Sequence, residues 1–144
     1  VLTRQNLPML QKDNRKENLV NKGAYKIRDF NEYDATILSS GSEVEIACSA
    51  SNKLLENNNL KIRVVSMSSF ELFEKNDDSY KNEILGNKPI FAIEAGVMNG
   101  WEKYIKDENF VGMSTFGESG PYKDLYKHFK ITDDYLIEKI IRNL

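Results

Sequence analysis

Hydrophobic and polar positions follow two different periods along the chain, and together these periods predict strands alternating with helices. Apolar or alternating runs predict strands at residues 24–28, 35–38, 61–67, 89–95 and 110–113. Apolar side chains three and four positions apart, supported by capping residues, predict helices or helical pieces at residues 43–57, 72–73, 79–85, 101–106, 121–129 and 133–144.

This order of elements predicts the fold class. Strands that are apolar on both faces and alternate with helices are typical of a mostly parallel sheet with helices on either side. We therefore expect an α/β domain of three layers, α/β/α, with about five strands. The pattern begins at residue 23, whereas residues 1–22 are mostly polar and follow neither period. We expect residues 1–22 to be a separate N-terminal segment and residues 23–144 to be the domain.

The predicted helix 43–57 has recognisable ends. Ser40 with Glu43, and Ser42 with Glu45, each have the spacing of a capping box at its start. The run of three asparagines at 57–59 marks its end, because asparagine tolerates the left-handed conformation that closes many helices.

Composition and charge exclude several classes of protein. The chain has 144 residues, 40% of them hydrophobic, and a net charge of −2. This near-balance argues against a basic nucleic-acid binder and a polybasic membrane-surface protein. Apolar runs stay well short of the ~18 residues that a membrane span needs, and we expect no signal peptide. A single cysteine excludes an internal disulfide and a multi-cysteine zinc site, so we expect a reducing, cytoplasmic setting.

Two candidate sites follow from the rule that parallel sheets bind ligands at the carboxyl ends of their strands. Ser40, Gly41 and Ser42 open a helix, where free amides attract anions, although a tight turn explains the same residues without a ligand. Glu94 ends an apolar strand, where burial favours an acid/base role. No second catalytic group is apparent beside it, so a structural hydrogen bond is the simpler interpretation.

Four further residues were weighed as candidates. The single histidine, His128, lies near a helix end and fits a surface or helix-dipole role better than catalysis. Cys48 falls on the inward stripe of its helix, as a small core residue does. Trp101 fits packing or an interface anchor. Arg4 carries a guanidinium suited to phosphate, but by itself it is only a charge near the terminus.

Seven segments in order resemble those of transketolases. Residues 3–8 resemble the family's SRQNLP, and 40–44 resemble its TGSEV. Residues 112–121 resemble its GM..FGESAP, with Gly120 in place of alanine. The other four are residues 23–25 (GGY), 63–68 (RVVSMP, with Ser68 in place of proline), 94–104 (EAG and W.KY) and 129–132 (FGIT, with Lys130 in place of glycine). The chain thus resembles a transketolase C-terminal domain preceded by the last strand of the pyrimidine-binding domain, which would lie within residues 1–22.

This resemblance implies a specific chemistry for a complete enzyme. Transketolases move two-carbon ketol units between sugar phosphates in the pentose phosphate pathway, as homodimers with thiamine diphosphate and a divalent metal, Mg or Ca. Their catalytic, cofactor-binding and metal-binding groups belong to the other domains, so we assign none of these to this chain. The arginine of the RQNLP segment binds the substrate phosphate, which implies that role for Arg4.

The chain as a whole has two interpretations. We expect the 144-residue chain to be inactive alone, to support architecture and dimer contact, and to be a fragment of a longer polypeptide. The alternative is a stand-alone regulatory module that binds an anion or nucleotide at its strand ends. The absence of a glycine-rich nucleotide motif counts against that alternative.

Overall fold

The computed structural model describes residues 5–10 and 17–144. The strands are β1 (Ala24–Arg28), β2 (Ala35–Ser39), β3 (Ile62–Met67), β4 (Ile90–Ile93) and β5 (Phe110–Val111). The α-helices are α1 (Glu43–Asn58), α2 (Phe70–Glu74), α3 (Asp78–Leu85), α4 (Tyr122–His128) and α5 (Asp133–Asn143). Short 3₁₀ turns are η1 (Leu19–Lys22), η2 (Trp101–Lys103) and η3 (Asp107–Asn109).

The five strands form one sheet in the order β1-β3-β2-β4-β5. Strand β2 lies at the centre, pairing in parallel with β3 through Ile37 and Val64 and with β4 through Ile37 and Phe91. Strands β4 and β5 are also parallel. All five residues of β2 are buried, because the sheet is covered on both faces. The predicted mostly parallel α/β sheet is confirmed.

Strand β1 is the exception, since it runs antiparallel to β3 and pairs Ala24 with Met67. The turn before it depends on Gly23, whose φ is +77° and whose carbonyl accepts from the amides of Ser68 and Ser69 at 2.7 and 2.9 Å. A Cβ on Gly23 would lie 2.2 Å from the Phe73 amide nitrogen. The reversed direction places the start of β1 at the edge where the parallel strands end.

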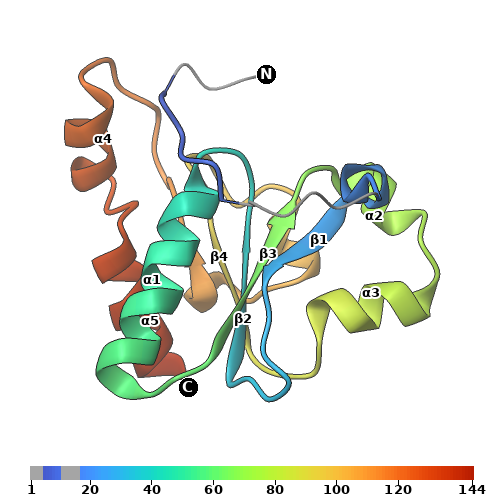
Figure 1. Cartoon of the computed structure of the whole chain (residues 1–144). Helices are drawn as coiled ribbons and strands as arrows, with labels where there is room; N and C mark the ends of the chain where they lie inside the picture. Colours follow the sequence, from blue (N-terminus) through green and yellow to red (C-terminus); the bar gives the residue numbers. More distant parts are fainter. Residues whose placement is uncertain (1–4, 11–16) are drawn as a thin grey trace.

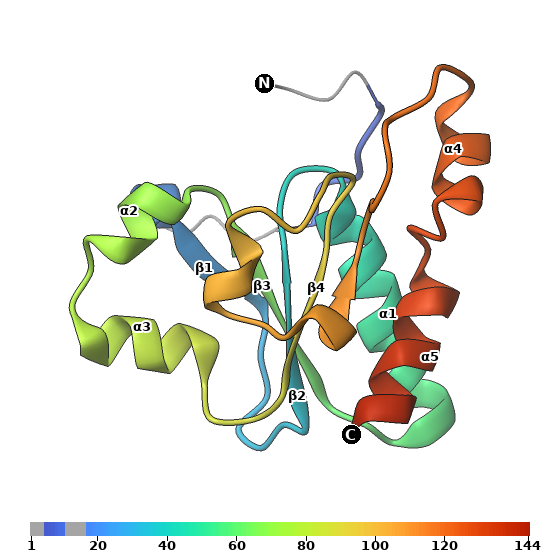
Figure 2. The ribbon, with the colours of Figure 1, turned by 180° about the vertical axis from the view of Figure 1, so that it is seen from behind.

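The helices divide the hydrophobic core into two layers (Figures 1 and 2). Helices α1 and α5 cover one face of the sheet, and α2, α3 and η2 cover the other. The first layer includes Ile37, Ala47, Leu54, Phe91, Leu136 and Ile140. The second includes Leu38, Val65, Phe73, Ile84, Ala92 and Trp101. Because alternate strand residues face opposite layers, both layers are built from the same short strands.

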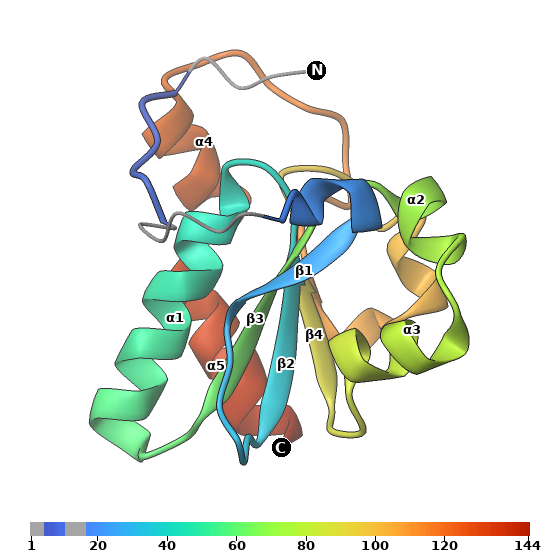
Figure 3. The same ribbon diagram turned by 45° about the vertical axis from the view of Figure 1, so that its right-hand side comes forward.

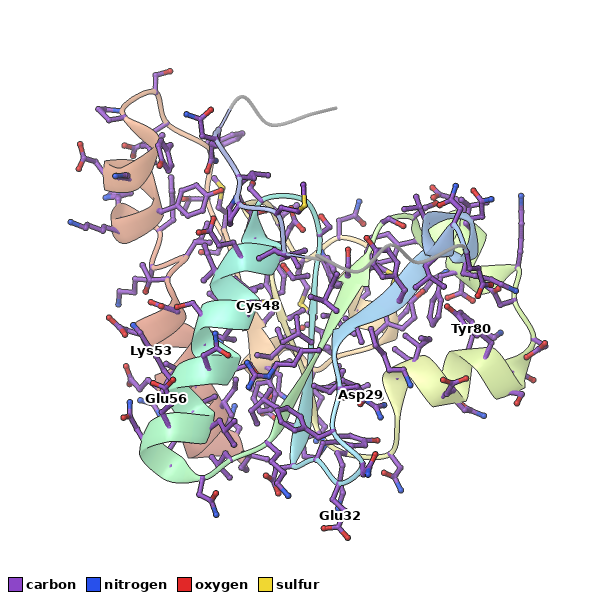
Figure 4. All side chains as sticks on the ribbon, in the orientation of Figure 1. Asp29, Glu32, Cys48, Lys53, Glu56 and Tyr80 are labelled. Carbon is purple, nitrogen blue, oxygen red and sulfur yellow. The ribbon has the colours of Figure 1, made fainter. Side chains whose placement is uncertain are left out.

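Helix α5 is joined to α1 by polar contacts as well as by apolar packing. Lys53 lies on α1 and points toward α5 (Figure 4), where its ammonium group pairs with Asp133 at 3.0 Å and Asp134 at 2.8 Å. The Ser49 hydroxyl donates to Asp133 at 2.5 Å. Thr132 caps α5 by accepting from the Tyr135 amide at 3.3 Å. These contacts fix where the last helix begins.

Three predicted elements are shorter than expected. The strand predicted over 89–95 spans only Ile90–Ile93. The pattern at 101–106 predicted a short helix, but only η2 forms, because the Tyr104 amide bonds to the Trp101 carbonyl three residues back at 2.9 Å. The strand predicted over 110–113 ends at Val111, after which the Met113 amide turns to the Gly96 carbonyl at 2.8 Å. Asn59, with φ of +54°, ends α1 in the left-handed conformation as predicted.

Candidate functional site

The polar edge of the sheet lies where β2 and β4 end and α1 begins. Ser40 follows β2, Glu94 follows β4, and Glu43 is the first residue of α1. Helix α4 extends beyond this edge beside the N-terminal end of α1, and residues 5–10 run past the same place (Figure 3). Three segments that are far apart in sequence therefore meet there.

Five residues form what we call the acid cluster: Ser40, Ser42, Glu43, Glu94 and Tyr126. The Ser40 hydroxyl donates to Glu94 at 2.6 Å, and the Ser42 hydroxyl donates to Glu43 at 2.6 Å. The Tyr126 hydroxyl donates to the same Glu43 oxygen. The predicted capping boxes are wrong, because the serine hydroxyls bind these carboxylates and Ser42 makes no side-chain cap on α1.

Burial dominates the electrostatics of the acid cluster. Glu43 is only 3% exposed. Burial raises the pKa of Glu94 to about 7, against the opposing effect of the Ser40 hydrogen bond, and the nearby charge of Glu43 raises it further. Burial and the hydrogen bond to Glu43 also raise the pKa of the Tyr126 hydroxyl. Glu94 therefore holds a proton for a large part of the time near neutral pH.

This arrangement disfavours an anion at the start of α1. A phosphate there would lie beside the Glu43 carboxylate, and the hydroxyl groups of Ser42 and Ser40 already donate to Glu43 and Glu94. Residues 40–42 therefore form a tight turn between β2 and α1, as in the simpler of the two interpretations, and not an anion site. Glu94 makes the expected structural hydrogen bond, but it also has an acidic neighbour, Glu43, which the sequence indicated only as a capping residue.

A side chain of the N-terminal segment contacts the acid cluster. The Gln5 amide Nε2 donates to the Tyr126 hydroxyl oxygen at 3.2 Å. Gln5 and Asn6 also line a hollow of about 380 Å³ between α1 and α4. Arg4, the predicted phosphate-binding residue, lies outside the described residues.

The other candidates lie away from this edge or are buried. His128 is exposed at the end of α4, 3.6 Å from Glu118, as a surface role expects. Cys48 is half-buried on α1 (Figure 4) against the first core layer, and burial raises its thiol pKa. Trp101 is buried and packs edge-to-face on Phe70 with ring centroids 5.0 Å apart. The structure thus gives Trp101 a packing role.

Two absences can be stated for the described part of the chain. None of its helices combines the length and apolar character that crossing a membrane requires. Among the same residues, no three His, Cys, Asp or Glu side chains are grouped so that they could hold a metal ion.

Comparison with known proteins identifies the class. The family model described as "Transketolase-like TK C-terminal domain" matches residues 23–132. The Sinorhizobium medicae transketolase is 43% identical over 99% of this chain and 21% of its own length, and that of Cereibacter sphaeroides is 40% identical over 96% and 21%. The Leishmania mexicana transketolase structure superposes with a TM-score of 0.78 at 40% identity, covering 83% of this chain and 18% of its own.

These matches show that the chain belongs to the transketolase C-terminal domain family. It spans about a fifth of the length of the transketolases that it matches. A split-gene transketolase, described as an inactive β4 tetramer, shares the fold with a TM-score of 0.72 at 16% identity. The relatives at 40% identity or more are named for a whole enzyme, and this chain matches one part of each of them.

Proposed function

We propose that this domain is the C-terminal part of a transketolase, a transferase that moves a two-carbon ketol unit between sugar phosphates. The carrying observation is the collinear match, which includes the RQNLP segment at residues 4–8 as well as the domain itself. A Pichia stipitis transketolase, 32% identical to this chain, has been solved in complex with sedoheptulose-7-phosphate. Sugar phosphates are therefore the proposed substrates of the complete enzyme.

The proposal includes an arrangement of parts. Residues 1–22 are the end of the preceding pyrimidine-binding domain and its linker, and residues 23–144 are the C-terminal domain. The domain supports the architecture and dimer contact of a cytoplasmic homodimer and has no catalytic residue of its own. This division is supported by the family match, which begins at residue 23, where the regular pattern also begins.

Thiamine diphosphate and its divalent metal, Mg or Ca, belong to the proposal through the family. The described residues do not fit them: they contain no metal-binding cluster, and the hydroxyl groups of Ser40 and Ser42 beside the start of α1 already donate to the acidic side chains of Glu94 and Glu43. We therefore assign the cofactor to the other domains of the enzyme, where it would supply the carbanion chemistry.

Within this chain the proposed substrate contact is Arg4. A guanidinium binds a phosphate through two parallel charge-assisted hydrogen bonds and holds it in one orientation. Arg4 would hold the phosphate end of the sugar, and that remote binding energy would orient the reacting end.

The test is Arg4→Ala in the complete polypeptide that carries this domain, assayed with ribose-5-phosphate and with ribose as acceptors. Loss of two such hydrogen bonds predicts a fall in kcat/KM of about 100-fold for the phosphorylated acceptor. The value for ribose and the affinity for thiamine diphosphate should change less than about two-fold. Arg142→Ala, which removes a 71% exposed arginine side chain, is the matched control. Equal losses with both acceptors would refute the assignment.

A further inference from the structure

The hydrogen bonds of the acid cluster form a directed path that ends on the N-terminal segment. The Glu43 carboxylate can only accept hydrogen bonds, so the Tyr126 hydroxyl is the donor between them and uses its single proton there. The Tyr126 oxygen is then left as an acceptor, and the Gln5 amide donates to it at 3.2 Å. The position of Gln5 is thus coupled to Glu43 through one hydroxyl group.

The inner end of this path is firmly held. Glu43 is the first residue of α1, it is 3% exposed, and its amide bonds to the Ser40 carbonyl at 3.2 Å. Its carboxylate also accepts from Ser42 at 2.6 Å. The Tyr126 ring packs edge-to-face against the Tyr122 ring, with centroids 6.0 Å apart. Tyr126, which accepts from Gln5, and Glu43, which accepts from Tyr126, therefore have few alternative positions.

The outer end has no fully buried apolar anchor among residues 5–10. Leu7, Met9 and Leu10 are 42%, 78% and 39% exposed. Burial of these side chains within the described chain stabilises the segment only weakly, because the hydrophobic effect scales with the apolar area removed from water. The hydrogen bond of Gln5 consequently contributes a larger share of the free energy that holds this segment in place than it would in a packed core.

We propose that Tyr126 and Glu43 are positioning residues for substrate binding: through Gln5 they hold the segment that presents Arg4 to the sugar phosphate. Arg4 and Gln5 are joined by one peptide bond, so their Cα atoms are about 3.8 Å apart, and restraining one restrains the other. The inference rests on the proposed function, because it assumes that Arg4 binds the phosphate. It assigns the C-terminal domain a part in substrate recognition.

The test compares two variants on the same helix in the complete polypeptide. Tyr126→Phe removes the hydroxyl and keeps the ring, whereas Tyr122→Phe removes a hydroxyl from a 48% exposed tyrosine and is the control. With a ketol donor that lacks phosphate, Tyr126→Phe should raise the KM for ribose-5-phosphate about ten-fold. The KM for ribose should change less than two-fold. Tyr122→Phe should change neither acceptor.

Two further measurements separate positioning from general structural support. Glu43→Gln keeps an acceptor oxygen for Tyr126, so it should raise the KM for ribose-5-phosphate less than Glu43→Ala does. Hydrogen–deuterium exchange in the peptide covering residues 5–10 should quicken in Tyr126→Phe and not in Tyr122→Phe. If Tyr126 acts only through Arg4, Tyr126→Phe should cause no further loss in an Arg4→Ala background.

The outcomes distinguish the inference from the proposed function. If Arg4→Ala fails to discriminate between the two acceptors, the proposed function is wrong and the inference falls with it. If Arg4→Ala discriminates but Tyr126→Phe matches Tyr122→Phe in kinetics and exchange, the inference alone is overturned. Equal losses with both acceptors in Tyr126→Phe would also overturn it, because they indicate a general structural defect.

Discussion

Replacing Glu94 by Gln should make the stability of the domain less dependent on pH. Glutamine keeps the shape of the side chain, can still accept from Ser40 as Glu94 does at 2.6 Å, and carries no charge. Burial, with the charge of Glu43, raises the pKa of Glu94 from 4.5 to about 7. Between these two values the folded chain therefore binds more protons than the unfolded chain at this position.

The sign and size of the effect follow from proton linkage. Where the folded state binds more protons, stability falls as the pH rises, so the Glu94 penalty is absent below about pH 4.5 and complete above about pH 7. A shift of this size corresponds to about 3 kcal/mol, which solvent screening of a partly exposed carboxyl reduces to about 2 kcal/mol. Glu94→Gln should therefore be about 2 kcal/mol more stable than the parent at pH 8 and nearly equal to it at pH 4.5.

The assay is urea unfolding of the chain and its variant from pH 4.5 to 8, followed by circular dichroism. Each variant is compared with the parent at the same pH, which removes the contributions of the other titrating groups. Glu56→Gln, at an exposed position on α1 (Figure 4), is the control and should shift the midpoint little at any pH. A Glu94→Gln variant that is less stable than the parent at pH 8, or a difference that does not vary with pH, would refute the reasoning.

Two further predictions concern left-handed backbone positions. Gly23→Ala should destabilise the domain by several kcal/mol more than Gly41→Ala in the same urea assay. Both glycines have positive φ, but an added Cβ meets backbone at 2.2 Å at Gly23, whereas nothing lies within 4 Å at Gly41. Equal losses of stability would contradict this steric explanation. Lys130→Gly should raise the stability of the domain by about 1 kcal/mol, because Lys130 has φ of +57°, where glycine is unstrained. A drop in the thermal midpoint would instead show that the contact of the Lys130 ammonium group with the Tyr135 ring, at 5.4 Å, contributes more to stability.

The sequence predicted the fold where periodicity and burial agree. The strands that form β2 and β3 and the helices that form α1 and α5 carry long apolar patterns, and their positions are confirmed within a few residues. The direction of β1 could not be predicted in the same way, because an alternating strand of five residues pairs equally well either way. Its direction depends on the turn at Gly23 and on contacts with residues 36 to 46 positions away.

The candidate site was predicted only in part. The strand-end rule indicated Ser40 and Glu94, which do lie together. Glu43 was predicted only as a capping residue, although it occupies the same helix stripe as Ala47 and Leu54, and a charged residue on a buried stripe is a usable signal. Tyr126 could not be found from the sequence, because it meets Glu43 only through tertiary contact across 83 residues.

The edge strands also bear on how the domain resists aggregation. Strand β5 has two residues, and β1 has five, with a break in register between Lys26 and Arg28. A very short edge at β5, and a bulged edge with two basic residues at β1, offer a second chain few consecutive backbone groups to pair with. Copies of this domain therefore have little opportunity to join by extending one another's sheets, even at the high local concentration of newly made protein.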